Sequence, residues 1–510
     1  MHIKGLIKKG EYFDSISLMI ATHKLNQLAG VLDAAIMMGT PENKALLKGS
    51  GFLIDLFLNA EDSDLLVAVK VADEEMAEDI LQKVAEQLKN IRKKERQDTD
   101  FAPRSLEGAL EVLPGANLVL ISVAGKYAAA EAMAALKKGL HVMIFSDNVP
   151  LEKELELKRY AHQHGLLVMG PDCGTAIING IPLAFANTVK RGDIGIVAAA
   201  GTGLQEVTCL ISNHGGGISQ AIGTGGRDVK QEVGGIMFLD ALETLAHDEQ
   251  TRAILLISKP PHPEVLAKIG QRVKECSKPV VAVFLGVAAQ EVEAYGMTAA
   301  ADLTEGAQKG LALVGIHADM SAGMDLTGLA NAIKAKLHGE QKYLRALFTG
   351  GTFCCETQVI LKGLPNLFAN APTAGAQLLG DVWKSQYHTV MDLGEDNFTV
   401  GKPHPMIDFS TRNQRILQEA QDPETAVILL DVVLGYGANM NPLGELMPVL
   451  YEAKAMACAQ HRELPVICSV TGTDADPQNR HLVIKTLMEA GCIVCASNAH
   501  ATRLCEKVIR

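Results

Sequence analysis

The stretch GDIGIVAAAGTGLQE, residues 192–206, decides the fold of this chain because it joins a strand pattern to a helix pattern through glycines. The β-branched residues Ile194 and Ile196 predict a strand buried in a sheet. The glycine turn 201–203 ends that strand, and from Leu204 onward apolar residues recur at helical spacing. A helix that begins in this way leaves the N–H groups of its first turn without helical acceptors, so the stretch also predicts an anion site.

Short apolar runs alternate with amphipathic stretches along almost the whole chain. The runs that we expect to form strands are 31–38, 64–71, 116–123, 140–146, 166–170, 194–200, 218–223, 253–258, 279–286, 344–350, 388–394, 426–435, 465–472 and 492–497. Several carry apolar residues at consecutive positions, as strands do when helices cover both faces of a parallel sheet. The sequence therefore predicts an α/β fold of three doubly wound, Rossmann-like or flavodoxin-like parallel-sheet domains.

Two seams separate the three predicted domains. The first lies near LLVMGPDCG, where a strand meets a glycine-proline loop, and the second is the polar stretch between His317 and Lys342. The expected boundaries are domains at 1–165, 166–318 and 343–510, with a linker at 319–342. This division agrees with an average of about 150 residues per domain.

Composition argues against several classes of function. The 510 residues carry a formal net charge of −12, and the lysines and arginines are mostly scattered, whereas nucleic-acid binding needs a basic stripe. The start MHIKGLIKKGEYFD has no apolar signal core, and no window approaches the ~18 apolar residues of a membrane span. The ten cysteines form no spaced disulfide framework. We therefore expect a reduced, cytoplasmic protein that binds neither nucleic acid nor membrane.

Two glycine turns that follow strands and precede helices are the strongest candidates for binding an anion. The first consists of Gly201, Thr202 and Gly203, and the second contains Gly435, Gly437 and Asn439. If the two turns converge, they would hold one phosphate or carboxylate of a small metabolite. The alternative is that such glycines only let helices pack tightly on strands. Neither turn fits the P-loop pattern, and no full G-x-G-x-x-G motif opens the first domain.

Several segments resemble the succinyl-CoA synthetases and the related NDP-forming acyl-CoA synthetases. From Asn117 to Asp228, LVLISVAG, MGPDCG, GDIGIVAAAGTGLQE and AIGTGGRD resemble the α subunit. From about Arg345, AVILLDVVLGYGANMNPLGELMPVLYEA and LPVICSVTGTDADPQNRHLVIKTLMEAGCIVCAS resemble the C-terminal domain of the β subunit. Across the whole chain IKKGEYFDSISLM, MMGTPENKALL, SKPP and VGKPHPMIDFSTRNQ resemble the FdrA family, in which these parts are fused.

The resemblance implies a CoA-binding-like first domain, a ligase-like second domain and a third domain like the C-terminal domain of the β subunit. In the synthetases two helix N-termini face a phosphohistidine, and the matching turns here are Gly201–Gly203 and Gly435–Asn439. Some FdrA members are linked to oxamate carbamoyl transfer in allantoin breakdown, within a multi-subunit enzyme. The resemblance thus implies partner subunits or a homo-oligomer, and it leaves CoA open as a cofactor.

The chain departs from the synthetase pattern where the phosphate relay would lie. The segment 287–306, which matches the phosphohistidine segment, contains no histidine. Lys259, followed by two prolines, stands where the family has a glutamate followed by glycines, and KKGEYFDS at 8–15 replaces the CoA loop. No ATP-grasp domain matches. These departures favour group transfer on a free acyl or carbamoyl phosphate, held by N–H groups and by the cation of Lys259.

Two residues are candidates for catalysis. His404, in GKPHPMIDFSTR, is held between prolines, and it acts as a general base or anion ligand, or is a buried histidine in a rigid loop. Lys259 binds the anion, or is a surface lysine at a strand end.

Five residues are candidates for contacting the substrate: Asp172, Cys173, Gly350, Gly351 and Thr352. Asp172 orients a ligand or caps a turn. Cys173 is a nucleophile or, with no basic neighbour evident, a small buried thiol. The glycine pairs in TGGRDV and FTGGTFCCE would shape the floor of the site. We expect no metal, because the C-x-x-C at 492–495 lies in an apolar strand and points to opposite faces.

Three functions remain open on these residues. The first is group transfer on an acyl or carbamoyl phosphate. The second is a CoA ligase that uses a separate ATP-grasp partner. The third is a non-catalytic scaffold or regulatory subunit that keeps the fold and an anion site. The sequence does not identify the substrate, the acceptor or the oligomeric state.

Overall fold

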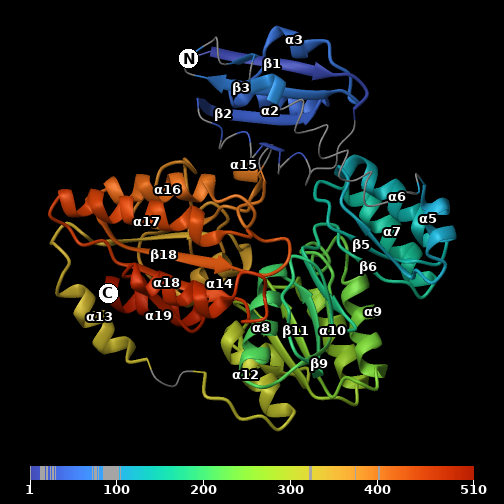
Figure 1. The fold of residues 1–510 in the computed structure, drawn as a ribbon. Coiled ribbons are helices and arrows are strands. Elements are labelled where there is room, and N and C mark those ends of the chain that lie inside the picture. The colour runs from blue at the N-terminus through green and yellow to red at the C-terminus, as the bar shows by residue number, and fades with distance from the viewer. Residues whose placement is uncertain are drawn as a thin grey trace. The chain divides into compact units, whose positions relative to one another are not determined.

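The computed structural model describes two units of the chain. It covers all residues except 1, 12–17, 19–20, 23–24, 26–27, 29, 72, 74–76, 79, 84–102, 104, 321–323, 374 and 400–402. Unit one comprises Met1–Leu140 with Thr399–Pro403, and unit two comprises His141–Phe398 with His404–Arg510 (Figure 1).

Unit one is built on an antiparallel sheet of three strands in the order β1-β3-β2. Its elements are β1 (His2–Lys8), β2 (Val31–Met38), α2 (Pro41–Gly49), α3 (Asp55–Leu58), β3 (Leu65–Val71), α5 (Leu106–Val112), β4 (Leu118–Ile121) and α6 (Gly125–Lys137). The prediction that 31–38 and 64–71 are strands of a parallel sheet is therefore wrong. Val67 and Val69 pack into one hydrophobic cluster and Leu66 into another, so β3 is covered on both faces. Such cover produces consecutive apolar residues whatever the strand direction.

The first large sheet of unit two has seven strands in the order β13-β12-β11-β9-β10-β7-β8. Strands β13, β12, β11, β9 and β10 are parallel to their neighbours in this order. Strands β7 and β8 are antiparallel and form one edge of the sheet. Its strands are β7 (Thr175–Ile178), β8 (Ile181–Ala184), β9 (Arg191–Ala199), β10 (Ile218–Gly223), β11 (Ala253–Ser258), β12 (Val280–Phe284) and β13 (Thr298–Ala299). Before it lie β5 (His141–Ile144), α7 (Leu151–Gln163) and β6 (Val168–Met169).

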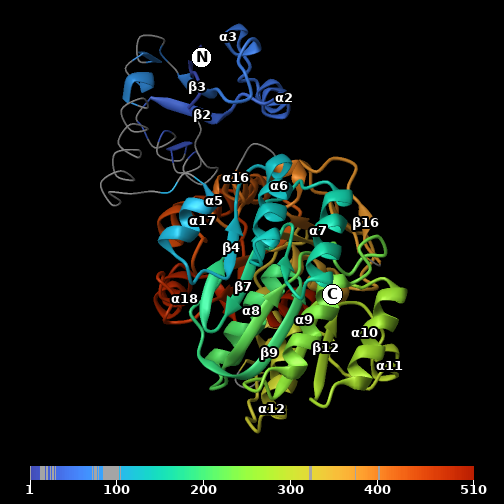
Figure 2. The ribbon, with the colours of Figure 1, turned by 90° about the vertical axis from the view of Figure 1, so that its right-hand side faces the viewer.

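Helices cover both faces of this sheet, as a doubly wound fold requires. They are α8 (Gly201–Asn213), α9 (Ile236–His247), α10 (Pro263–Glu275), α11 (Ala289–Glu293) and α12 (Leu303–Leu313). Helix α8 packs beside α12 on one face and α9 beside α10 on the other (Figures 1 and 2).

The second large sheet of unit two is parallel throughout, in the order β16-β15-β17-β14-β18-β19-β20. Its strands are β14 (Tyr343–Phe348), β15 (Leu367–Ala369), β16 (Gln377–Leu378), β17 (His388–Asp392), β18 (Thr425–Val433), β19 (Val466–Thr471) and β20 (Ile493–Cys495). Its helices are α13 (Leu326–Lys334), α14 (Gly351–Ile360), α15 (Asp396–Thr399), α16 (Ser410–Gln421), α17 (Pro442–Ala459), α18 (Arg480–Glu489) and α19 (Asn498–Ile509). All nine residues of β18 are buried, as in a central parallel strand. The predicted α/β class with parallel sheets is confirmed.

One hydrophobic cluster runs through both large sheets. It contains Leu204 of α8 and Ile257 of β11 in the first sheet, and Phe353 of α14 and Leu504 of α19 beside the second. The clustering places α8 against α14, and in Figure 1 these helices lie where the green and orange parts of unit two meet. Among the helices of the described ranges, none is both long and apolar enough to cross a bilayer.

Candidate functional site

The first turn of α8 has the geometry that the sequence predicts. Strand β9 ends at Ala199, Ala200 is the residue before the helix, and no described side chain caps the helix start. The first helical hydrogen bond runs from Leu204 N to Ala200 O. The N–H groups of Gly201, Thr202 and Gly203 precede that bond and point outward along the helix axis. Gly201 is exposed, so this end of the helix is accessible to a ligand.

The first turn of α14 meets the first turn of α8. The backbone N–H of Thr352 donates to Oγ1 of Thr202 at 3.3 Å. A Cβ on Gly350 would lie 2.9 Å from Thr202 Oγ1, and a Cβ on Gly203 would lie 2.8 Å from Thr352 Cγ2. The two glycines are therefore required by the close approach of the helices.

The α14 turn already has a carboxylate of its own. Asp431, fully buried at the end of β18, accepts hydrogen bonds from Thr349 N, Thr349 Oγ1 and Gly350 N, each at 2.8 Å. Arg412 Nη1 contacts the same carboxylate at 3.3 Å and holds it in place. The N–H groups of Thr349 and Gly350, which precede α14, therefore have an internal acceptor.

The turn at Gly435 is a structural joint. Gly435 N donates to Gln478 Oε1 at 3.0 Å, and Asn439 N donates to Met406 O at 2.8 Å. Helix α17 begins only at Pro442, which has no N–H. The prediction that this turn presents bare N–H groups at a helix start is therefore wrong for these residues.

The glycines of this joint allow another segment to approach. Gly435 and Gly437 adopt positive φ angles of 108° and 78°. A Cβ on Gly435 would lie 2.5 Å from Ala186 O, and a Cβ on Gly437 would lie 2.9 Å from the Phe185 ring. The alternative interpretation, close packing, explains both glycines.

Lys259, Asp392 and His404 gather around two other glycines. Beside Gly351, where a Cβ would stand, lie Asp392 Oδ2 and, at 3.5 Å, Lys259 Nζ. Beside Gly394 the corresponding point is 3.0 Å from His404 Nε2 and 3.1 Å from Asp392 Oδ1. The structure thus brings the two predicted catalytic residues together around a buried carboxylate that the sequence interpretation missed. The sequence feature that could have pointed to Asp392 is its place in VMDLG, an acidic residue at the carboxyl end of a parallel strand.

Burial and neighbouring charges change the pKa values of Asp392 and Lys259 in this cluster. Burial raises the pKa of Asp392 to about 6, and Glu395 adds to the shift while Lys259 opposes it. Burial alone would lower the pKa of Lys259, but the negative potential of Asp392 and its neighbours raises it overall. Lys259 is therefore a cation at neutral pH beside a carboxyl group that can exchange a proton near pH 6.

A second carboxyl group with a raised pKa lies within electrostatic reach of Lys259. Asp172 follows the cis peptide bond Gly170–Pro171, and its N–H donates to Ser146 O at 3.0 Å. Part of the residue is exposed, but burial of its carboxyl group and then the charge of Asp147 raise its pKa to about 6, while Arg227 and Lys259 oppose the shift. Asp172 is thus a second acid–base candidate, linked to Lys259 through its electrostatic effect.

The cysteines of this region are protonated thiols at neutral pH. Cys173 is buried, its Sγ donates weakly to Thr175 O at 3.6 Å, and burial raises its pKa to about 12. Burial likewise raises the pKa of Cys355 to about 11 and holds that of Cys354 well above its usual value. These values support the buried-thiol alternative over a nucleophile.

The pattern G-T-x-x-x-E occurs at 201–206, in α8, and again at 351–356, in α14. The glutamate of each copy accepts a hydrogen bond from a helix start in the other domain. Glu206 of α8 accepts from the N–H of Asn498, the first residue of α19, at 3.3 Å. Glu356 of α14 accepts from the N–H of Leu303, the first residue of α12, at 2.8 Å. Each helix therefore supplies the acceptor for a helix start in the other domain. The sequence interpretation missed this exchange, although the repeat was its visible signal.

Asn498 links the two glutamates of this exchange. Its side-chain Nδ2 donates to Glu356 Oε2 at 2.7 Å, while its backbone N–H donates to Glu206 Oε1. Burial, followed by the charge of Asp302, raises the pKa of Glu356 to about 8. Glu356 is therefore mostly protonated at neutral pH.

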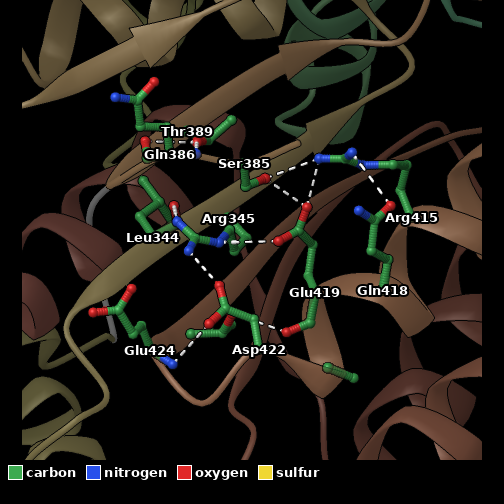
Figure 3. Close-up of polar contacts among 12 residues, drawn as sticks. Leu344, Arg345, Ser385, Gln386, Thr389, Arg415, Gln418, Glu419, Asp422 and Glu424 are labelled. Atoms are coloured by element: carbon green, nitrogen blue, oxygen red, sulfur yellow. Dashed lines mark hydrogen bonds and ion pairs between the residues drawn. The ribbon is translucent and has the colours of Figure 1, made fainter. Parts of the chain in front are cut away.

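A buried ion network fixes the strand from which α14 starts. Arg345 of β14 contacts Glu419 at 3.0 Å and Asp422 at 2.5 Å, and Arg415 contacts the other Glu419 oxygen at 2.5 Å (Figure 3). Arg345 and Arg415 also donate to the backbone oxygens of Tyr387 and Trp383. The network anchors α16 and the segment before β17, the strand that carries Asp392.

Comparison with known protein families matches three parts of the chain. The model described as CoA-ligase matches residues 347–508, and the one described as CoA binding domain matches residues 189–286. The model described as AllF, heavy metal-associated domain, matches residues 1–103. The CoA-binding match thus lies in the second predicted domain, whereas the resemblance placed such a domain at 1–165.

Relatives agree with these matches. The chain is 42% identical over 514 residues to "Uncharacterized protein YahF" of Escherichia coli K12, which covers 100% of this chain and 99% of that protein. It is 30% identical over 181 residues to the succinate–CoA ligase [ADP-forming] subunit alpha of Aquifex aeolicus, covering 34% of this chain and 58% of the subunit. It is 28% identical over 191 residues to the malate–CoA ligase subunit alpha of Methylorubrum extorquens, covering 36% and 63%.

The family match to residues 1–103 is described as heavy metal-associated, but this segment lacks the cysteine side chains that bind such metals. Residues 1–103 contain no cysteine, and their histidines are His2 and His23 alone. Soft metals select thiolate ligands, which this segment lacks. Within the ranges that the structure describes, no group of three or more histidine, cysteine or acidic side chains could hold a metal ion.

Proposed function

The chain belongs to the family of the Escherichia coli protein YahF, and on this premise we propose that it is a group-transfer enzyme or subunit acting on carbamoyl or acyl phosphate. It carries this activity on CoA-ligase and CoA-binding domains. The observation that carries the proposal is the position of Lys259, a cation near the start of α14 and beside Asp392, a buried carboxyl group with a raised pKa. The assignment to FdrA-type oxamate carbamoyl transfer is part of the proposal.

The anionic end of the substrate lies at the start of α8. Gly201 is exposed there, and the N–H groups of residues 201–203 precede the first helical hydrogen bond. A phosphate accepts hydrogen bonds from such groups and gains from the positive end of the helix dipole. Lys259 adds a full positive charge to the site.

The carboxyl groups favour a carbamoyl group over a simple acyl group. Asp172 and Asp392 are ionised above a pH of about 6 and then accept hydrogen bonds from N–H donors. A carbamoyl group carries an NH2 donor, whereas an acetyl group offers none. Carboxylates beside a phosphate would otherwise repel the ligand, so their presence selects a substrate that has both an anionic end and N–H groups.

The transfer uses these groups in one step. The amide nitrogen of an acceptor such as oxamate attacks the carbonyl carbon of carbamoyl phosphate, and the C–O bond to the phosphate breaks. The bonding electron pair leaves on the phosphate, which α8 and Lys259 stabilise. The proton of the attacking nitrogen passes to Asp172 or Asp392, whose pKa of about 6 suits a base at neutral pH.

A CoA ligase with a separate ATP-grasp partner is the second candidate, and the two CoA-related family matches favour it. CoA would supply a thiol acceptor, and residues 201–203 with Lys259 would hold one of its phosphate groups. The two ligands would then compete for one site. The lack of a histidine in 287–306 counts against a complete phosphohistidine relay.

Ligand-induced stabilisation tests the proposal. We expect carbamoyl phosphate to raise the Tm of the full chain and of Lys268→Met, which changes an exposed lysine of α10, but not that of Lys259→Met. Stabilisation by CoA and not by carbamoyl phosphate would instead support the ligase. If neither ligand acts, even with partner subunits present, the proposal is wrong and a scaffold role is favoured.

A further inference from the structure

The segment around His404 holds its imidazole in one orientation. Prolines 403 and 405 flank the residue and restrict its backbone. The N–H groups of Ile407 and Asp408 both donate to His404 O, at 2.8 and 3.2 Å. The turn that results leads directly into α16, which begins at Ser410. The ring is therefore positioned by a closed turn and not by a free loop.

The same turn determines which ring nitrogen carries the proton. The backbone N–H of Met406 points at His404 Nδ1, 3.2 Å away. A nitrogen that accepts a hydrogen bond has no proton of its own, so the neutral ring carries its proton on Nε2. This tautomer is assigned from the hydrogen bond.

Protonation of the ring would break this arrangement. An imidazolium has a proton on Nδ1 as well, which would face the N–H of Met406 and place two donors against each other. Burial also lowers the pKa of His404 to about 4. Asp392 at the end of β17 lies beside Gly394 as His404 does, and Lys259 after β11 lies beside Gly351 with Asp392, and neither charge is the cause of that shift.

The protonated nitrogen faces the site. Nε2 lies 3.0 Å from the point where Gly394 would carry a Cβ, and Asp392 Oδ1 lies 3.1 Å from the same point. On another side the Phe185 ring lies 5.6 Å from the imidazole, centroid to centroid. Because Gly394 has no side chain, Nε2 of His404 and Oδ1 of Asp392 both border the space that such a side chain would fill.

We propose that His404 acts as a neutral hydrogen-bond donor through Nε2, which contacts the carbonyl oxygen of the transferred group, and not as a general base. This role rests on the proposed function. Negative charge develops on that oxygen when the acceptor attacks, and a fixed N–H donor stabilises it. Base catalysis then remains with the carboxyl groups, which leaves each group of the cluster with a distinct part.

Nitrogen NMR tests the tautomer independently of activity. The full chain with 15N-labelled histidine is titrated from pH 5.5 to 8.5, and His404→Gln and the exposed-residue control His481→Gln assign the signals. We expect His404 to keep one protonated and one bare nitrogen over this range, with the proton on Nε2. An imidazolium at pH 6, or a proton on Nδ1, would overturn the proposal.

Kinetics tests the role in the site. With oxamate as acceptor, phosphate release from carbamoyl phosphate is measured for His404→Gln, which keeps an N–H donor near the Nε2 position, and for His404→Phe, which has none. We expect kcat to fall less than about tenfold in the first and about 10²- to 10³-fold in the second, with little change in KM. Equal losses in both variants would reject the donor role. If the wild type binds no carbamoyl phosphate, the proposed function fails while the tautomer result still stands.

Discussion

The backbone N–H of Thr352 donates to Oγ1 of Thr202, so the first turns of two helices 150 residues apart in the chain are hydrogen-bonded to each other. The contact joins the CoA-binding match to the CoA-ligase match and puts Gly351 beside Lys259 and Asp392. The site therefore depends on how closely α8 and α14 approach.

Gly203→Ala should weaken this approach. A Cβ at 203 would lie 2.8 Å from Thr352 Cγ2 and 3.3 Å from Ile257 and Leu303, so the helices must move apart. Overpacking of this kind lowers the free energy of unfolding by about 1–3 kcal/mol. Urea denaturation measures the change, and Gly339→Ala is the control, because a Cβ there meets nothing within 4 Å. Equal stability of the two variants would show that the helices do not meet as described.

Transfer activity should rise with pH and level off above a pH of about 6. Asp172 and Asp392 both have a pKa raised to about 6, so they are protonated below that pH and can neither take a proton nor accept N–H hydrogen bonds. The measurement is kcat/KM between pH 4.5 and 8. Asp392→Asn should lower the plateau by about 10²- to 10⁴-fold if Asp392 is the base. A profile that is flat from pH 5 to 7 would contradict the assignment of both carboxyl groups.

Glu356→Gln should remove part of the pH dependence of stability. The folded-state pKa of about 8 lies above the ordinary value of 4.5, so the contribution of Glu356 to stability falls as pH rises from about 4.5 to 8 and falls no further above that. The slope from one such group is at most ~1.4 kcal/mol per pH unit. Glutamine keeps a neutral acceptor for Leu303 N, so the variant should be more stable than the wild type at pH 8. Parallel stability curves for the two proteins would show that Glu356 is ionised in both states.

Glu419→Ala should be strongly destabilising. It removes the carboxylate that pairs with both Arg345 and Arg415, whose side chains are buried. Breaking a buried pair in this way costs about 3–5 kcal/mol. Glu424→Ala, an exposed change in the short segment that follows α16, should cost less than about 0.5 kcal/mol. Chemical denaturation compares the two, and a small loss for Glu419→Ala would mean that water replaces the carboxylate.

The parallel sheets and the turn at 201–203 could be predicted from the spacing of apolar residues and glycines over short stretches of sequence. Strand β9, the glycines and α8 are consecutive in the chain, so their spacing is visible in the sequence. The direction of β3 was not visible, because a strand covered on both faces reads the same in either direction. In unit one this led to the wrong sheet.

The partner of the α8 turn could not be predicted either. Gly350 and Gly435 both follow buried strands, and only tertiary packing brings the first of them to Thr202. Asp392 was missed because one acidic residue at a strand end is common. Its meaning comes from Lys259 and His404, which lie 133 and 12 residues away in the sequence and join it only through packing.

The meeting of α8 and α14 has a further consequence because both helices belong to one covalent chain. Dilution cannot separate them, since the tether keeps each at a high effective concentration around the other. Loss of the Thr202–Thr352 contact would therefore be a first-order opening, independent of protein concentration. If the same two helices belonged to separate subunits, their contact would be lost at low protein concentration. In this chain the contact would persist even at a few molecules per cell.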